Sequence, residues 1–187
     1  MKYLSLLLLA TLFLSSGCGN DDDVPIITII GRQDGWSVTD VESDFAAQAN
    51  AAITAATDEE LANDTRTRAD IQAQFDLLVA QETAVDDCDR DDALLFRSDG
   101  LMQLFRGDVI CPGTGDPHVL DGLKNFFYST DIDGTRMRIR NLDNETVTTY
   151  DILELSEDAF RFKNNRVVED STVGPVLYEL TYSLRAR

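Results

Sequence analysis

The sequence has little of what most catalytic and nucleic-acid-binding sites are built from. Its 187 residues include one histidine, three cysteines and 16 basic residues against 34 acidic ones, giving a formal net charge of −18. An acidic surface repels phosphate backbones, so nucleic-acid binding through a basic footprint is excluded. The single histidine has no partner base, nucleophile or metal-ligand spacing nearby. The sequence therefore predicts no catalytic residue, metal site or cofactor, and we expect a protein that is not an enzyme.

Long hydrophobic runs are also absent. The longest mostly apolar stretch, residues 4–14, is shorter than the roughly 18 residues that a transmembrane helix needs. Lys2 precedes this stretch and small residues follow it, which is the pattern of a secretory signal peptide over residues 1–17. A hydrophobic content of 43% is too high for a wholly disordered chain, and the length fits one domain.

The end of the signal peptide indicates a lipid anchor. Ser15, Ser16 and Gly17 stand directly before Cys18, and this arrangement resembles the bacterial lipobox. The resemblance implies cleavage before Cys18, acylation of its sulfur and amine with chains such as palmitate, and attachment to a membrane. The alternative is an ordinary signal peptide that leaves a free cysteine in the mature chain.

A short acidic segment follows the anchor, with three aspartates at positions 21–23. One interpretation is a solvated spacer. The other is a resemblance to the surface-export signal of many Gram-negative lipoproteins. We therefore expect residues 18–28 to be a lipidated cysteine and acidic linker on an outer-membrane protein that faces the cell exterior.

The remaining residues, 29–187, read as one all-β domain with a helical insert. Alternation of side chains and turn signals predict eight strands, at residues 35–41, 92–98, 101–106, 123–130, 135–142, 145–155, 159–168 and 176–185. Tight turns between them predict an antiparallel meander, and closure into an eight-stranded up-and-down barrel removes its exposed edges. Residues 26–30 form a further β-prone run that extends the first strand or pairs separately.

The insert spans about residues 43–85. Apolar residues recur at helical spacing over residues 45–56 and again over residues 71–78, and Thr57 with Glu60 forms a capping-box pattern. These helices are either a lid over a cavity mouth or extra core packed against one end of the sheet, and the second interpretation is slightly favoured.

Two cysteines remain for a disulfide. Asp99-Gly100 predicts a hairpin with a two-residue turn, and in that register Cys88 and Cys111 lie opposite each other, within bonding distance. An exported protein meets an oxidising compartment, and lipid modification uses Cys18, so these two can pair with none left over. A metal or thiol-catalytic role lacks the necessary neighbours.

The last strand predicts which side chains face the barrel interior. Val176, Leu180 and Leu184 share one face with Tyr178 and Tyr182, and they alternate with a second set of residues: Leu177, Glu179, Thr181 and Ser183. Trp36, Phe127 and five other residues are their expected companions: Phe96, Phe105, Met137, Ile139 and Phe162. A barrel of eight strands either fills its interior or holds one small ligand, so Trp36, Phe127, Tyr178 and Tyr182 are candidate ligand-binding residues, although core packing explains them too.

Arginines at positions 136, 138 and 140 form a row on one outer face. The row either binds anionic sugars or lipid headgroups, or is paired with carboxylates on neighbouring strands, and the second interpretation is favoured.

Several motifs together carry a family resemblance. Gly35-Trp36 begins the first strand, Cys88 precedes the segment from Phe96 to Gly100, and residues 150–155 read Tyr-Asp-Ile-Leu-Glu-Leu. Over residues 29–186 the chain resembles the bacterial lipocalin-like lipoprotein domains. The resemblance implies an eight-stranded barrel at the membrane surface. We expect it to bind a small apolar or amphipathic molecule; the alternative is a filled barrel that acts as a structural or partner-binding module in a surface protein complex.

Overall fold

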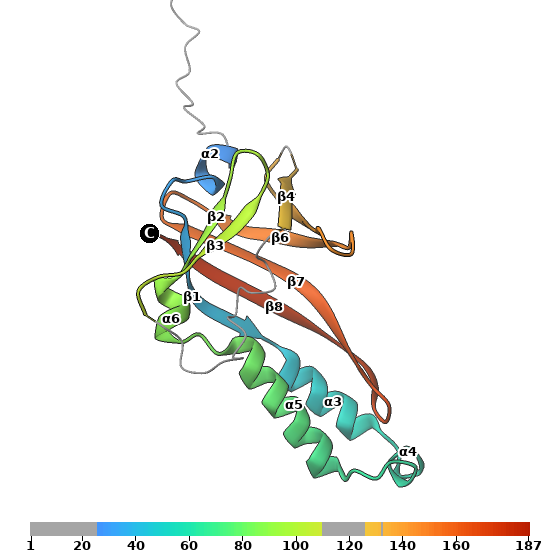
Figure 1. The fold of residues 1–187 in the computed structure, drawn as a ribbon. Coiled ribbons are helices and arrows are strands. Elements are labelled where there is room, and N and C mark those ends of the chain that lie inside the picture. The colour runs from blue at the N-terminus through green and yellow to red at the C-terminus, as the bar shows by residue number, and fades with distance from the viewer. Residues whose placement is uncertain (1–25, 110–125, 132) are drawn as a thin grey trace, which may run out of the picture.

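In the computed structural model, which describes residues 26–109, 126–131 and 133–187, eight antiparallel strands form one nearly closed barrel (Figure 1). The strands are β1 (Trp36–Ser43), β2 (Ala93–Phe96), β3 (Met102–Phe105), β4 (Phe126–Thr130), β5 (Arg136–Asn141), β6 (Val147–Leu155), β7 (Ala159–Asp170) and β8 (Gly174–Ala186). Their order in the sheet is β3-β2-β1-β8-β7-β6-β5-β4. The predicted antiparallel meander is therefore confirmed, with the first strand paired to the last.

The barrel closes between β3 and β4, at the tip of the β2–β3 hairpin. Leu101 forms an isolated antiparallel bridge with Phe127, and the amide of Tyr128 donates to the carbonyl oxygen of Gly100 at 2.7 Å. The hydroxyl of Tyr128 donates to the carbonyl oxygen of Arg97 at 2.9 Å. These contacts hold β4 to the hairpin where a continuous ladder of strand pairing is missing.

One end of the barrel is filled by a hydrophobic core. Trp36 is fully buried at its centre, packs against Phe160 with ring centroids 5.5 Å apart, and donates from Nε1 to the carbonyl oxygen of Ile30 at 2.9 Å. The predicted inward face of β8 is confirmed, because its five members are all buried: Val176, Tyr178, Leu180, Tyr182 and Leu184. Trp36 and the inward-facing residues of β8 are therefore mainly part of the hydrophobic core.

The β2–β3 hairpin corrects the predicted turn. Its loop has three residues, 98–100, because the Arg97 amide donates to Leu101 and the Gly100 amide donates back to Arg97, both at 2.9 Å. Gly100 takes a positive φ of 85°, as expected for a turn that ends in a left-handed residue. Leu94 consequently pairs with Leu104 instead of Phe105, so Phe105 turns outward and is 54% exposed. The prediction that Phe105 faces inward is wrong, because a one-residue slip in register reverses the faces of a strand.

The same correction removes the register argument for the disulfide. Cys88 is buried on the short helix α6 (Asp87–Asp91), not on a strand that continues β2. Cys111 lies outside the described residues. The pairing of Cys88 with Cys111 therefore stays a prediction that depends on the oxidising compartment and the cysteine count.

The run at residues 26–30 forms a short helix, α2 (Ile26–Ile30), so the prediction of an additional strand there is wrong. Ile30 is fully buried in the barrel core, and its carbonyl oxygen accepts the hydrogen bond from Trp36. These tertiary contacts outweigh the β propensity of four isoleucines in a short segment.

The insert contains three helices, α3 (Phe45–Ala55), α4 (Asp58–Ala62) and α5 (Arg68–Thr83). The predicted capping box of Thr57 and Glu60 starts α4, and Thr67 with Asp70 forms a second one at the start of α5. Apolar residues of α3 and α5 form a second hydrophobic cluster with the beginning of β8: Phe45, Ala49, Ile53, Ile71, Phe75, Val176 and Tyr178. The helices thus form extra core against β8 and β1 (Figure 1).

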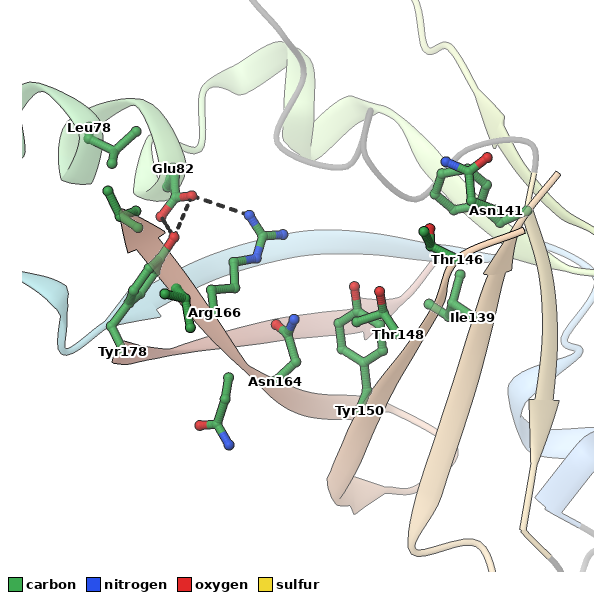
Figure 2. Close-up of a pocket in the computed structure, with 14 residues that line it drawn as sticks. Leu78, Glu82, Ile139, Asn141, Thr146, Thr148, Tyr150, Asn164, Arg166 and Tyr178 are labelled. Carbon is green, nitrogen blue, oxygen red and sulfur yellow. Dashed lines mark hydrogen bonds and ion pairs between the residues drawn. The ribbon is translucent and has the colours of Figure 1, made fainter. Parts of the chain in front are cut away.

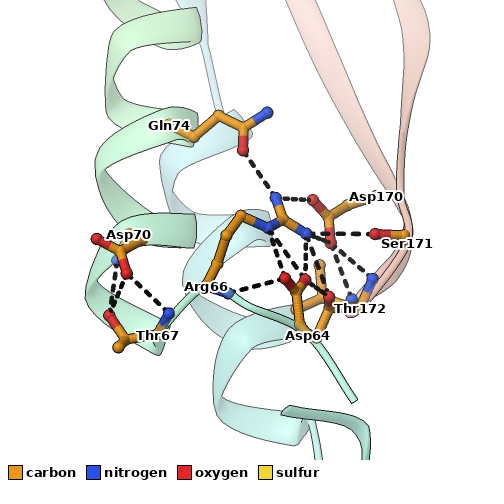
Figure 3. Close-up of polar contacts among 9 residues, drawn as sticks. Asp64, Arg66, Thr67, Asp70, Gln74, Asp170, Ser171 and Thr172 are labelled. Atoms are coloured by element: carbon orange, nitrogen blue, oxygen red, sulfur yellow. Dashed lines mark hydrogen bonds and ion pairs between the residues drawn. The ribbon is translucent and has the colours of Figure 1, made fainter. Parts of the chain in front are cut away.

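A polar cluster ties the insert to the turn between β7 and β8 (Figure 3). Arg66, between α4 and α5, forms ion pairs with Asp64 at 2.6 Å and with Asp170 at 2.9 Å. Thr172 donates from its hydroxyl to Asp64, while its amide donates to Asp170 at 2.9 Å. The segment between α4 and α5 is therefore anchored on the turn between β7 and β8. Within the part of the chain that the structure describes, no helix is long and apolar enough to span a membrane.

Candidate functional site: a cavity where β6 and β7 diverge

The wall of the barrel opens between β6 and β7. These strands pair only from Asp151 opposite Lys163 to Leu155 opposite Phe160. Before Asp151, β6 pairs with β5 alone, whereas after Lys163, β7 pairs with β8 alone. The two halves of the sheet therefore separate, and the side chains directly beyond the separation face a space that no strand fills.

A cavity of about 490 Å³ occupies this space (Figure 2). It is lined by residues from α5 and five strands: Leu78, Glu82, Phe126, Ile139, Asn141, Thr146, Thr148, Tyr150, Asn164, Asn165, Arg166, Val167, Val168 and Tyr178. Most of these side chains carry a hydrogen-bonding group. Its volume lies in the lower part of the range of about 300–1,000 Å³ that is usual for small-molecule sites.

Glu82 and Arg166 connect helix α5 to the barrel interior at one side of the cavity. The Tyr178 hydroxyl lies 2.8 Å from both carboxylate oxygens of Glu82, and the Arg166 guanidinium contacts the same carboxylate at 3.2 Å. Arg166 also donates to the hydroxyl of Tyr182 at 3.0 Å. Helix α5 is thus held beside the cavity by contacts of Glu82 with Tyr178 and Arg166, and Arg166 in turn contacts Tyr182.

The two tyrosines and the arginine of this network are each held in one charge state. Burial raises the pKa of Tyr178 and Tyr182 above the ordinary value for tyrosine, and hydrogen bonding to Glu82 adds to the rise at Tyr178. Burial on its own lowers the pKa of Arg166, but its interactions with the Tyr182 hydroxyl and the Glu82 carboxylate outweigh this effect, so the pKa is raised. The tyrosines therefore stay neutral and Arg166 stays charged at any physiological pH.

Asn164 is the unusual member of the lining. Only 7% of the residue is exposed, and its side-chain oxygen Oδ1 is buried without a hydrogen-bond partner among the described residues. In the view of Figure 2 its side chain lies between those of Arg166 and Tyr150. A buried carbonyl oxygen without a donor costs about 1–3 kcal/mol, so such groups are rare in folded proteins.

The four predicted ligand-binding residues do not lie together. Tyr178 lines the cavity, whereas Tyr182 is buried beneath it, where its hydroxyl contacts Arg166. Trp36 lies in the filled core. Phe127 points to the outer face, where the guanidinium of Arg140 lies 5.5 Å above its ring, so the expectation that Phe127 faces inward is wrong. Its neighbours on β4, Phe126 and Tyr128, take the inward positions.

Sequence reasoning missed Glu82, Asn164 and Arg166. The alternation of β7 contained a signal for two of them, because buried Phe160 and Phe162 share their face with positions 164 and 166. Two adjacent asparagines, at positions 164 and 165, are also typical of a bend or bulge, which conceals this signal. Polar residues at inward positions of a barrel strand were the available sign of a polar cavity.

The arginine row lies on the outer face of β5, as predicted. Arg138 and Arg136 approach the carboxylate of Asp131 at 3.0 and 3.7 Å, and Arg140 covers Phe127. Two of the three arginines thus share an acidic partner, which agrees with the favoured interpretation of the row.

Over residues 26–109, 126–131 and 133–187, no cluster of three histidine, cysteine or acidic side chains is arranged to hold a metal ion.

The fold and the cavity define the chain as an eight-stranded antiparallel barrel with a helical insert and a polar interior site. Comparison of the sequence with models of known protein families and with curated proteins found no match.

Proposed function

We propose that this chain is a lipocalin-like lipoprotein, anchored in the outer membrane through Cys18 and facing the cell exterior, which binds a small amphipathic molecule without transforming it. The cavity between β6 and β7 is the observation that carries the proposal. Its volume of about 490 Å³ suits one small molecule, and its lining combines apolar Phe126 and Ile139 with the polar side chains of β6 and β7.

The lining of the cavity also indicates which class of ligand to expect. The sequence predicts an apolar or amphipathic ligand, and a lining in which polar side chains predominate favours the amphipathic one. The Glu82–Arg166 network supports a binding role because it fixes the position of α5 against the cavity before any ligand enters. A site that is ordered in advance loses less conformational entropy on binding.

Native mass spectrometry tests the binding function. The protein is extracted from its own host's membranes in mild detergent and compared with a denatured sample. We expect a noncovalent mass of a few hundred daltons that is lost on denaturation. A protein that carries no such mass, extracted from cells in several growth phases, would contradict the proposal and would favour a filled module.

Membrane fractionation tests the anchor. Cys18→Ala removes the acylated sulfur, so we expect the variant to leave the membrane fraction, because several acyl chains hold a protein on a membrane almost permanently. Cys88→Ser is the matched control and is expected to remain membrane-bound. Surface exposure is then measured by protease treatment of intact cells. Retention of Cys18→Ala in membranes would refute the lipoprotein assignment.

A partner-binding module in a surface complex is the second candidate. Val167 and Leu177 lie opposite each other on the outer face of β7 and β8, and they are 52% and 59% exposed. A photo-crosslinking residue at position 177 would capture a protein partner on intact cells if this face is an interface. A matched crosslinker at the exposed position 50 on α3 identifies unspecific products.

A further inference from the structure

We propose that the ligand of the β6–β7 cavity is a short extended peptide that adds as a strand to the unpaired edge of β7. This inference rests on the proposed binding function and names the chemical class of the ligand.

Alternate residues of β7 direct their backbone groups to opposite neighbours. The Ser156 amide donates to the carbonyl oxygen of Ala159 at 2.8 Å, so Ala159 faces β6. The Ala186 amide donates to the carbonyl oxygen of Asp158 at 2.9 Å, so Asp158, directly before the strand, faces β8. The register with β8 has no shift from Ala159 to Asp170. Because an antiparallel ladder repeats every two residues, the odd-numbered residues of β7 therefore face the β6 side along the whole strand.

Three of these odd-numbered residues lie beyond the pairing with β6: Asn165, Val167 and Glu169. The pairing ends at Lys163, and none of the hydrogen bonds of the described residues reaches the backbone N–H or C=O groups of these three. Their side chains are exposed on the outer face of β7. This free edge of β7 thus presents backbone donors and acceptors at the spacing of a strand, which is what an added strand pairs with.

Two cavities adjoin each other along the free edge. The cavity of about 490 Å³ is lined by five successive residues of β7, 164–168. Successive side chains of a strand point to opposite faces, so such a lining means that the cavity borders the edge of the strand. A second cavity of about 220 Å³ continues from Val168 to Asp170, and Leu78 of α5 lines both. Together they follow about 20 Å of strand, so the space has the elongated form of an extended chain.

The side chains around the free edge suit a peptide whose residues alternate in character. Phe126, Ile139 and Leu78 supply apolar surface inside the larger cavity. On the outer face, Glu169 is exposed and forms no ion pair among the described residues. Every second residue of an added strand points inward, so apolar residues at these positions and a basic residue between them match the two faces.

The charge of the chain argues against a second copy as the occupant. Each copy has a formal net charge of −18 and would bring its own Glu169 to the same edge. Like charges on neighbouring strands are destabilising, whereas a basic residue near Glu169 is favourable. The occupant is therefore a peptide of about five residues, the length of the free edge from Asn165 to Glu169.

A palindromic peptide tests the backbone pairing. The probe is acetyl-Thr-Val-Lys-Val-Thr-amide, whose residue order is the same for parallel and antiparallel addition. Two analogues replace alternate backbone amides by esters, which removes the N–H donors on one side of the extended peptide and keeps its side chains. Each is titrated by calorimetry against the full mature lipoprotein in lipid nanodiscs, with empty nanodiscs subtracted. We expect at least one ester analogue to bind about tenfold more weakly than the probe, because it loses hydrogen bonds to the free edge.

Amide hydrogen exchange resolved to single residues locates the bound peptide. We expect the amides of Asn165, Val167 and Glu169 to exchange freely in the protein alone and to become protected when the probe binds. The amides of Arg166 and Val168 face β8 and are internal controls, so they should be protected in both states. A ligand that only fills the cavity would not protect alternate residues.

Two substitutions at one position separate the backbone from the side chain. Val167→Pro removes the N–H at the centre of the free edge, and proline is tolerated in an edge strand when that N–H faces away from the sheet. The variant should therefore fold and bind the probe at least about tenfold more weakly. Val167→Thr keeps the backbone donor and should bind like wild type. If Val167→Pro does not fold, the ester analogues and the exchange pattern of the wild-type protein decide the question.

The outcomes separate this inference from the proposed function. If both ester analogues bind as tightly as the probe, or if a folded Val167→Pro keeps its affinity, the inference is overturned while the binding function stands. The same holds if the unliganded lipoprotein is a dimer that Val167→Pro dissociates, or if the molecule released from native protein is not a peptide. If no probe binds and native mass spectrometry finds no bound molecule, both proposals fail.

Discussion

Arg66 and Asp170 form an ion pair at 2.9 Å, although 104 residues separate them along the chain. Asp64 and Thr172 complete the cluster, so one guanidinium joins the loop between α4 and α5 to the turn between β7 and β8 (Figure 3). The far end of the insert is therefore fixed by polar contacts, while its middle is fixed by the hydrophobic cluster. The two kinds of contact respond differently to pH.

The Arg66 cluster predicts an acid-sensitive contribution to stability. Hydrogen bonding to Arg66 holds the pKa of Asp64 well below its ordinary value of 3.8. At Asp170 burial raises the pKa, but hydrogen bonds from Arg66 and Thr172 outweigh it and the pKa is lowered. Groups with a lowered pKa stabilise the fold above their ordinary value, and this contribution is lost as pH falls through the lower folded-state value.

We therefore expect Arg66→Met to reduce the free energy of unfolding at pH 7, and the difference from wild type to shrink as pH falls below about 4. Urea unfolding at pH 7, 4 and 2.5 measures it. Arg97→Met is the control, because Arg97 forms an exposed pair with Asp99 and such pairs contribute little. A difference for Arg66→Met that stays constant across this range would show that the cluster acts through packing alone.

The second hydrophobic cluster predicts that the insert is part of the folded core. Phe75 on α5 is buried against Phe45, with ring centroids 5.3 Å apart. Phe75→Ala should cost about 3–5 kcal/mol of unfolding free energy because it empties a packed position. Leu77→Ala, on the same helix but 59% exposed, should change it by less than about 0.5 kcal/mol. Equal, small effects in chemical denaturation would instead indicate a loosely attached lid.

Gly35, at the start of β1, occupies a position where we expect any other residue to destabilise the fold. It has a positive φ of 74°, and a Cβ there would lie 2.9 Å from the carbonyl oxygen of Leu94. Gly174 has a similar φ of 76° but open space around it. Gly174→Ala should therefore cost about 1 kcal/mol from backbone strain alone, and Gly35→Ala clearly more, since steric overlap is added. Thermal unfolding of both variants makes the comparison, and equal losses would mean that the contact with Leu94 relaxes freely.

The predicted disulfide implies that substitution of either cysteine destabilises the fold by a similar amount. If Cys88 and Cys111 are bonded, Cys88→Ser, Cys111→Ser and the double variant should each lose a similar 2–5 kcal/mol, about the usual value for a small secreted domain. Burial of Cys88 adds a packing loss for its own substitution, so Cys111→Ser is the cleaner variant. Thiol titration of the denatured wild type should find neither thiol free. Two titratable thiols would refute the disulfide.

Local patterns in the sequence were sufficient to predict the strands of the barrel and the start of α4. The alternation of Tyr178 and Tyr182 with polar neighbours gave the inner face of β8, and Thr57 with Glu60 marked the start of α4. Phe105 and Phe127 show the limit, because their faces depend on turn length and on strand parity near the barrel closure. Alternation cannot fix either of these within a strand of four or five residues.

The position of the cavity along the barrel wall could not be predicted, for a related reason. The cavity exists because the pairing of β6 with β7 ends at the pair Asp151 and Lys163. The point where two strands separate is a property of the whole barrel. Asn164 reads as a local irregularity in the sequence and becomes a site only when α5 places Glu82 near Arg166. The ligand-binding candidates chosen for their size and aromatic character were therefore mostly core residues.

The pairing of β1 with β8 also sets the order in which this barrel can assemble. Trp36 pairs with Ala186, so the ladder that joins the first strand to the last brings together nearly the whole described chain. Contacts of such long sequence separation carry a large loop-closure entropy and form slowly. Until β8 is available, β1 and β7 each expose an unpaired edge that can bind another chain. The final thirteen residues of the sheet, Gly174–Ala186, thus protect the protein from self-association as well as completing its wall.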